Sequence, residues 1–257
     1  MTLRERLLRW QWILSAQFGF DPLRLLRSLR GLARYFGGLR RFRASYRGRL
    51  ELVPCLHDWM EEGGSARDEY FWQDLLVARL IFAARPQRHV DVGSRVDGFV
   101  AHVASFREIE VLDVRPIAAR VPGITFRQAD LMQPLPELAS YCDSLSCLHA
   151  LEHFGLGRYG DPVDSEGFKR GLANLARLLK PKGMLYLSVP IGKPRVEFNA
   201  QTVSDPREVV RLAAAQSLTF NELTVIRYGA VPETQRSDLE SLAAERYALG
   251  LFVFQKT

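Results

Sequence analysis

Cysteine is scarce in this chain of 257 residues, which has only Cys55, Cys142 and Cys147. They form no CxxC pair, and none of them falls into a Cys/His spacing that binds zinc. The sequence therefore excludes a disulfide framework and a zinc motif, and we predict no metal site. Scattered single cysteines are typical of a reducing compartment, so we expect a cytoplasmic location.

Long apolar runs are also missing. The longest uncharged stretch near the start, Trp10–Phe20, has eleven residues, whereas a helix needs about 20 to cross a bilayer. A signal-peptide pattern is not seen either. Hydrophobic residues make up 47% and charged residues 25% of the chain, which is typical of a globular protein.

Acidic residues and lysine are almost absent from residues 1–50. This segment has twelve arginines, no lysine and two acids, so its charge is +12 − 2 = +10. The whole chain carries +6, which leaves −4 for the remainder. We therefore predict a basic helical N-terminal extension, residues 1–67, attached to a mildly acidic domain, residues 68–257.

Within the extension, Asp21 and Pro22 are a suitable N-cap and first residue for a helix. Arginines occupy mostly the other side of this helix, and we expect Gly37–Gly38 to end it. The apolar face is made of Leu25, Leu26, Leu29, Leu32, Ala33 and Phe36.

The extension has three readings. Its leucine face suits packing on the main domain as a lid, and its arginines with nearby tryptophans suit peripheral contact with an anionic membrane. Arginine clusters also suit nucleic acid. Because the main domain is acidic and no nucleic-acid module is recognised, nucleic acid is the least favoured partner.

Beyond residue 88, short apolar strands alternate with helices, which is typical of a doubly wound, mostly parallel α/β sheet. Two late strands, 218–227 and 249–255, are joined by an irregular link of about twenty residues. Further strands are expected at 89–92, 109–114, 124–129, 142–148 and 184–190, and helices at 68–84, 97–105, 166–179 and 205–216.

The stretch "RHVDVGSRVDGFVAHVASF", residues 88–106, reads as strand, glycine turn and helix. The start of such a helix attracts negative charge. Dinucleotide loops use three glycines, but here Arg95 stands between Gly93 and Gly98. Arg95 should crowd a pyrophosphate and suits a cofactor that carries an amino-acid carboxylate. The alternative is a plain strand–helix turn.

Two acids follow the next strands. Asp113, twenty residues after Gly93, is placed to accept hydrogen bonds from ribose hydroxyls, or it simply caps the turn before Pro116. Asp130 could accept the amine of an adenine, with Leu131 beside the ring.

The strand at 142–148 leads into His149, Glu152 and His153. Ligands bind at the carboxyl ends of strands in such sheets, and histidine is a frequent general base. These three side chains could also hold a divalent cation, or serve only to fasten the loop.

Taken in order, "HVDVGSRVDGF", "VLDVRP", "QADL", "DSLSCLHALEHF" and "LLKPKGMLYLSVP" resemble a class I S-adenosylmethionine-dependent methyltransferase. The resemblance covers roughly residues 70–257. More closely, "VDVGSRVDGFVAHVASF" with "ALEHFGLGRYGDPVD" is similar to bacterial and animal proteins known only as a domain of unknown function. The resemblance implies genes that lie near those of polysaccharide-modifying enzymes.

The resemblance implies a Rossmann-like, seven-stranded, mostly parallel sheet with an antiparallel C-terminal strand. It implies an S-adenosylmethionine site at Asp91, Gly93, Ser94, Arg95, Gly98, Asp113, Asp130 and Leu131. Arg95 and Asp97 replace the usual glycines of this loop.

The implied reaction is in-line methyl transfer to a small-molecule or saccharide acceptor, such as a lipid-linked glycan. His153 or His149 is the expected base, oriented by Glu152. A non-catalytic methyltransferase-like binding module is the alternative. A dinucleotide oxidoreductase is disfavoured by Arg95 and by the two late strands.

Overall fold

The computed structural model describes residues 3–59, 61, 64–118, 120–235 and 238–257. The chain divides into two compact units, residues 1–65 and residues 66–257. Among the described residues, no helix combines the length and the apolar character needed to cross a membrane.

The first unit holds two helices, α1 (Leu3–Phe18) and α2 (Pro22–Ser45). Asp21 caps α2 as expected, since its carboxylate accepts hydrogen bonds from the backbone N–H groups of Leu23 and Arg24 at 2.9 and 3.1 Å. The expected end at Gly37–Gly38 was wrong, because α2 continues to Ser45. Each glycine costs only about 1 kcal/mol relative to alanine in a helix, and the leucine and arginines that follow favour helix.

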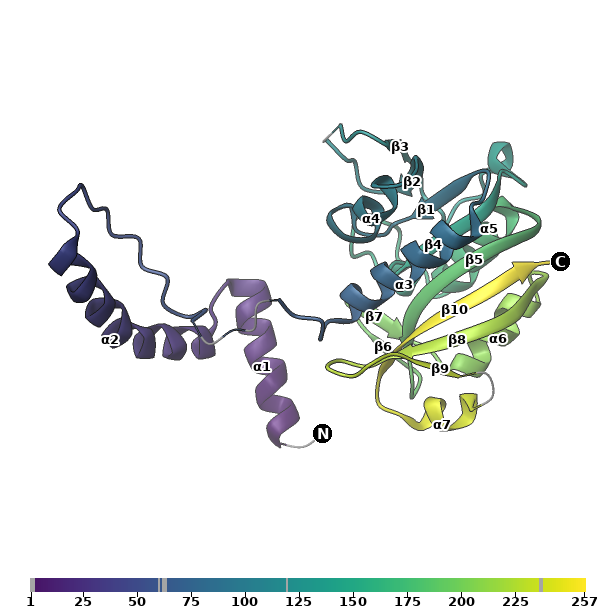
Figure 1. The fold of residues 1–257 in the computed structure, drawn as a ribbon. Coiled ribbons are helices and arrows are strands. Elements are labelled where there is room, and N and C mark those ends of the chain that lie inside the picture. Colours follow the sequence, from purple (N-terminus) through teal and green to yellow (C-terminus); the bar gives the residue numbers. More distant parts are fainter. Residues whose placement is uncertain (1–2, 60, 62–63, 119, 236–237) are drawn as a thin grey trace. The chain divides into compact units, whose positions relative to one another are not determined.

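The second unit is built on one sheet of eight strands, in the order β3-β2-β1-β4-β5-β10-β8-β9 (Figure 1). Neighbouring strands from β3 to β5 run parallel, whereas β10 runs antiparallel to both β5 and β8. The strands are β1 (His89–Val92), β2 (Ile109–Asp113), β3 (Ile124–Gln128), β4 (Cys142–Leu148), β5 (Leu179–Ile191), β8 (Leu218–Ile226), β9 (Glu233–Gln235) and β10 (Ala248–Lys256).

This architecture confirms the predicted α/β fold, with one strand more than the seven expected. The extra strand, β9, lies in the late link that looked irregular in the sequence, and it pairs with β8. A separate two-stranded sheet consists of β6 (Arg195–Glu197) and β7 (Gln201–Val203).

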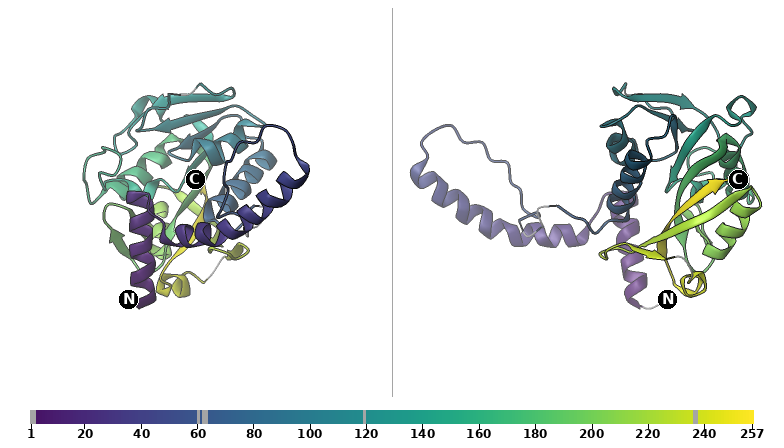
Figure 2. Two further views of the ribbon diagram at one scale, coloured as in Figure 1. Left: turned by 90° about the vertical axis from the view of Figure 1, so that its left-hand side faces the viewer. Right: turned by 45° about the vertical axis from the view of Figure 1, so that its right-hand side comes forward.

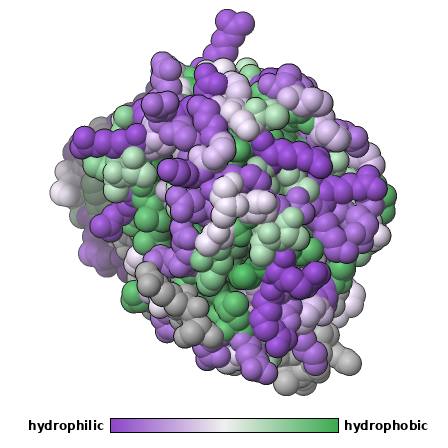
Figure 3. All heavy atoms as spheres, turned by 90° about the vertical axis from the view of Figure 1, so that its right-hand side faces the viewer, coloured by the Kyte–Doolittle hydropathy of each residue, from purple (hydrophilic) through white to green (hydrophobic). Residues whose placement is uncertain are grey.

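Helices cover both faces of the main sheet (Figure 2). On one face α3 and α4 pack through Val77, Ile81 and Val103, and on the other α5 and α6 pack through Leu175 and Val209. The face shown in Figure 3 has hydrophobic side chains interrupted by polar ones. The helices are α3 (Glu69–Ala84), α4 (Ala101–Ala104), α5 (Gly167–Leu178), α6 (Pro206–Ala214) and α7 (Leu239–Ala244); a π-helical turn, η1, spans Val96–Val100, and short 3-10 turns are η2 (Pro136–Leu138) and η3 (Leu151–His153).

The parallel order decides where the site lies. Because β1 to β4 run in the same direction, their carboxyl ends meet at one edge of the sheet. Asp113 is the last residue of β2, and Gly93, Asp130 and His149 follow the ends of β1, β3 and β4. This is the edge at which ligands bind in open α/β sheets.

Candidate active site

The side chain of Asp91 fixes the loop that follows β1. This fully buried carboxylate accepts hydrogen bonds from the Ser94 backbone N–H at 3.0 Å, and from the Ser94 and Ser146 hydroxyls at 2.6 Å each. Burial raises the pKa of Asp91 to about 6, against the effect of these hydrogen bonds. Ser94 Oγ also accepts from the backbone N–H of Leu148 at 3.2 Å, which ties the loop to β4. Asp91 and Ser94 therefore fasten the loop.

Gly93 makes a close approach that no side chain would allow. Its φ is +71°, and a Cβ at this position would lie 2.8 Å from the Cβ of Ala150. The left-handed backbone and the missing side chain let the loop turn tightly beside the segment that follows β4.

Arg95, the residue in place of the middle glycine, is paired within the loop. Its Nε and Nη2 donate to the two carboxylate oxygens of Asp97 at 3.1 and 2.9 Å. Its guanidinium also lies 5.2 Å from the ring centre of Tyr70. Arg95 and Asp97, which replace the usual glycines, therefore form an ion pair with each other.

The next glycine, Gly98, interrupts the helix start. It lies within η1 with φ −127° and ψ −107°, and a Cβ there would lie 2.5 Å from Asp74 Oδ2 of α3. Such π-helical turns are frequent at functional sites.

A pocket of about 530 Å³, counted to its open mouth, lies at the carboxyl edge of the sheet. Asp91, Ser94, Arg95, Gly98 and Glu152 are not among its lining residues. Six of the predicted site residues line it, namely Gly93, Asp113, Asp130, Leu131, His149 and His153.

Asp113 is mostly buried and is held by Arg115, which sequence reasoning missed. The Arg115 side chain donates from Nε to Asp113 Oδ1 at 3.0 Å and from Nη2 to Oδ2 at 2.7 Å. Its guanidinium lies 4.3 Å from the ring centre of Tyr159, and all three residues line the pocket. The signal in the sequence was the acid and arginine two residues apart in "DVR".

Asp130 lines the same pocket. Its Oδ1 accepts a hydrogen bond from the backbone N–H of Met132 at 2.8 Å. Leu131 and Met132 are buried and line the same pocket.

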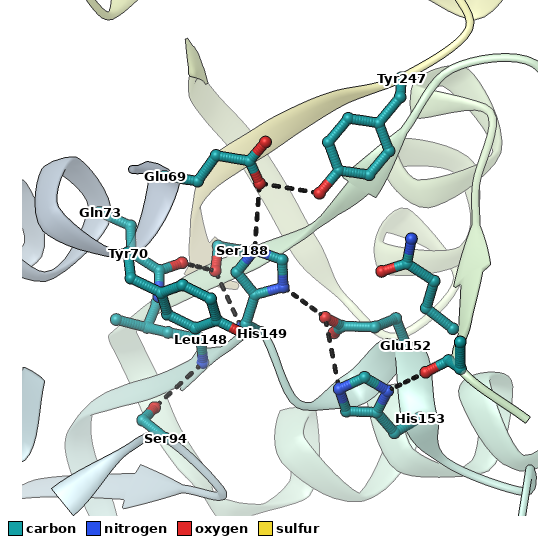
Figure 4. Close-up of polar contacts among 12 residues, drawn as sticks. Glu69, Tyr70, Gln73, Ser94, Leu148, His149, Glu152, His153, Ser188 and Tyr247 are labelled. Atoms are coloured by element: carbon teal, nitrogen blue, oxygen red, sulfur yellow. Dashed lines mark hydrogen bonds and ion pairs between the residues drawn. The ribbon is translucent and has the colours of Figure 1, made fainter. Parts of the chain in front are cut away.

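His149 lies between two carboxylates (Figure 4). Its Nδ1 is 2.6 Å from Glu152 Oε1, and its Nε2 is 3.4 Å from Glu69 Oε2. Its ring stacks on Tyr70 at a centroid distance of 4.6 Å. Burial lowers the pKa of His149, but Glu152 and Glu69 outweigh it and raise the pKa to about 9. His149 is therefore charged near neutral pH.

Further contacts fix His149 from α3, from β5 and from Tyr247, the residue directly before β10. The backbone N–H of His149 donates to Ser188 Oγ at 3.0 Å, and this hydroxyl donates to Gln73 Oε1 at 2.6 Å. The Tyr247 hydroxyl donates to Glu69 Oε2 at 2.7 Å (Figure 4). Sequence reasoning missed these partners. Glu69 and Gln73 share a face of α3 at a spacing of four residues, but nothing local to Tyr247 indicates the contact.

His153 has a different environment. Its Nδ1 lies 2.7 Å from the carbonyl oxygen of Ala200, which only accepts, so Nδ1 carries the proton. Nε2 lies 3.8 Å from Glu152 Oε1. Burial lowers the pKa of His153, Arg158 adds to this effect, and Glu152 opposes it. A neutral His153 therefore carries its ring lone pair on Nε2, which also lies 3.5 Å from Arg158 Nη1.

Among the residues that the structure describes, no group of three or more His, Cys, Asp or Glu side chains is arranged to hold a metal ion.

The fold is similar to solved methyltransferase-like structures. The chain aligns over 72% of its length with N-methyltransferase NodS from Bradyrhizobium japonicum WM9 (94% of that chain, TM-score 0.50, 16% identity). It aligns over 72% with a putative sarcosine dimethylglycine methyltransferase from Galdieria sulphuraria (85% of that chain, TM-score 0.51, 14% identity). It also aligns over 71% with the [4+2]-cyclase SpnF (81% of that chain, TM-score 0.51, 15% identity).

A family model, described as Caenorhabditis protein of unknown function DUF268, matches residues 118–228. No curated protein matches the sequence. At identities of 14 to 16%, these likenesses show the fold alone, and they confirm the predicted Rossmann-like methyltransferase fold of the second unit.

Proposed function

We propose that this protein is an S-adenosylmethionine-dependent methyltransferase that methylates a hydroxyl group of a small molecule or saccharide, a lipid-linked glycan included. The observation that carries this proposal is the pocket itself. Asp113, Asp130 and a glycine turn at Gly93 from three strand ends surround one cavity, and His153 lines the same cavity.

The residues present fit the cofactor. Gly93 places a tight backbone turn without a side chain in the pocket lining at the end of β1, and Asp113 and Asp130 offer carboxylates at the ends of β2 and β3. We assign the ribose hydroxyls to Asp113, the adenine amine to Asp130 and the ring contact to Leu131. When bound, S-adenosylmethionine supplies a methyl group on a positively charged sulfur.

The two histidines take different roles, because their surroundings shift their pKa values apart. His153, with a lowered pKa, is neutral and accepts the proton of the acceptor hydroxyl at Nε2 as the new oxygen–carbon bond forms and the sulfur–carbon bond breaks. His149, with a raised pKa, stays protonated and holds Glu152 in place. His153 is therefore the proposed base, and His149 and Glu152 are positioning residues.

The experiment is calorimetric titration of the full chain with S-adenosylmethionine and S-adenosylhomocysteine, with Asp113→Ala as the control. Micromolar binding that the substitution abolishes is the expected result. Methyl transfer is then measured on a panel of hydroxylated small molecules and saccharides, with His153→Gln as the inactive control. Tight cofactor binding without transfer to any hydroxyl, but with transfer to amines, would overturn the assignment of the acceptor.

A non-catalytic binding module is the second candidate, and the pairing of Asp113 with Arg115 favours it, since both carboxylate oxygens already have partners. The fold also allows other chemistry, because the structurally similar SpnF is a [4+2]-cyclase. The same titration separates the two candidates. No heat and no thermal shift with either ligand would support the binding module.

A further inference from the structure

The first unit leaves one face of α2 uncovered by its own residues. Leu25, Leu29, Leu32 and Phe36 follow one another at intervals of four, three and four residues, which places them on one side of a helix. The side chains of Leu25, Leu29 and Phe36 are 50, 56 and 58% exposed. A single helix seldom presents so continuous an apolar stripe without a partner.

The segment that returns along α2, residues 46–59, covers a different side of the helix. A Cβ on Gly31 would lie 2.0 Å from the carbonyl oxygen of Leu56, so the returning backbone touches the helix at this glycine. Arg34 lies 4.8 Å from the ring centre of Trp59 in the same segment. Gly31 is about 200° around the helix from Leu29. Among the described residues of this unit, the contacts therefore leave Leu25, Leu29 and Phe36 exposed.

Arginine occupies the side of α2 opposite this face. Arg24, Arg27, Arg30 and Arg34 project from the remaining circumference of α2, within a segment of charge +10. Trp10, Trp12 and Phe18 of α1 are 63, 55 and 75% exposed. A leucine face, an arginine face and exposed tryptophans are the properties of a helix that lies in a membrane interface.

We propose that α2 binds the surface of an anionic lipid membrane, with Leu25, Leu29 and Phe36 inserted among the acyl chains and the arginines on the phosphate groups. Charge complementarity favours an anionic occupant. A second copy of the chain would bring a segment of charge +10 against an identical one. Nucleic acid would use the arginines but leave the leucine face without a role.

The test is co-sedimentation of the full chain with vesicles of phosphatidylcholine alone, or with 30 to 40% phosphatidylglycerol. We expect binding to the anionic vesicles, weakening as salt rises. The triple substitution Arg24→Gln, Arg27→Gln and Arg30→Gln should weaken partition about a hundredfold, because each arginine near such a surface contributes about a factor of five. Leu25→Ser with Leu29→Ser should weaken it at least about tenfold.

A matched control removes two exposed apolar side chains from the second unit, Val196→Ser with Val231→Ser, which are 59 and 75% exposed. These substitutions should leave binding unchanged, and circular dichroism verifies that all variants are folded. Equal binding to neutral vesicles would overturn the proposal. So would a dimer that Leu25→Ser with Leu29→Ser dissociates, or binding of an oligonucleotide but not of vesicles. Cofactor titration of the same variants keeps this result separate from the proposed function.

Discussion

Arg115 occupies both carboxylate oxygens of Asp113, with hydrogen bonds of 3.0 and 2.7 Å from its side chain. The Arg115 backbone N–H adds a third hydrogen bond of 2.8 Å to Oδ1. Asp113 is also the acid that we assign to the ribose. The ribose hydroxyls and the guanidinium therefore compete for the same oxygens, and the position of Arg115 should control cofactor affinity.

Removing this competitor should strengthen cofactor binding. We expect Arg115→Ala to bind S-adenosylhomocysteine about fivefold more tightly in calorimetry, a modest effect because the guanidinium is partly exposed and screened by solvent. The matched control is Arg207→Ala. Arg207 contacts Asp205 through the same backbone and side-chain hydrogen bonds, but outside the pocket. If Arg115→Ala instead weakens binding as strongly as Asp113→Ala, Arg115 contacts the cofactor directly.

Substitution of the proposed base should affect turnover and leave binding intact. His153→Gln should lower kcat about 100- to 10,000-fold, the usual contribution of a general base. In the unaltered protein, kcat should be level near neutral pH and fall only in acid, because the pKa of His153 lies below its usual value. Stopped assays over a pH series measure kcat, and calorimetry with S-adenosylhomocysteine measures cofactor affinity. His57→Gln, in the first unit, is the control. If His153→Gln lost cofactor affinity together with turnover, the assignment of His153 as the base would be contradicted.

His149 should stabilise the fold in a pH-dependent way. Its pKa is raised from 6.5 to about 9 in the folded protein, after Glu152 and Glu69 outweigh burial. The contribution of its charge is therefore complete below pH 6.5 and is lost as the pH rises through about 9. It amounts to roughly 3 kcal/mol.

We expect His149→Asn, which tolerates the left-handed backbone at φ +52°, to lower the free energy of unfolding at pH 6. The difference from the unaltered protein should shrink between pH 7 and pH 10 in urea titrations. His57→Asn controls for the loss of one histidine. A difference that stays constant over this range would mean that the charge of His149 does not stabilise the fold.

The sequence predicted the fold well because the evidence for it is local. Strand β4 and helix α6 could be placed from the alternation of short apolar strands with helices. Short β9 consists of polar residues and has no apolar pattern. It lies at the edge of the sheet, where it pairs with β8. Apolar periodicity therefore indicates elements that bury one face, and it does not reveal a short polar edge strand such as β9.

The candidate site was only partly predictable. Asp113 and His153 follow strand ends, which a sequence shows, but the partners that set their chemistry are remote or unexpected. Ala200 lies 47 residues from His153, and Tyr247 lies 178 residues from Glu69. Which of two nearby histidines is charged depends on such contacts, so the choice of His153 over His149 needed the structure.

The remaining prediction concerns the unusual loop. Gly98→Ala should lower the free energy of unfolding by about 1 to 3 kcal/mol, the usual cost of forcing an extra methyl group into a packed site. The new Cβ would lie 2.5 Å from Asp74 Oδ2, and Asp74 is buried and already accepts a hydrogen bond from Gln73 at 3.1 Å, so its carboxylate has little room to move. Because the clash involves that carboxylate, Asp74→Ala should relieve it. The double variant should be more stable than the sum of the two single effects predicts. Urea unfolding of the four proteins measures this coupling. Strictly additive effects would show that Gly98 is required by the loop backbone and not by its contact with α3.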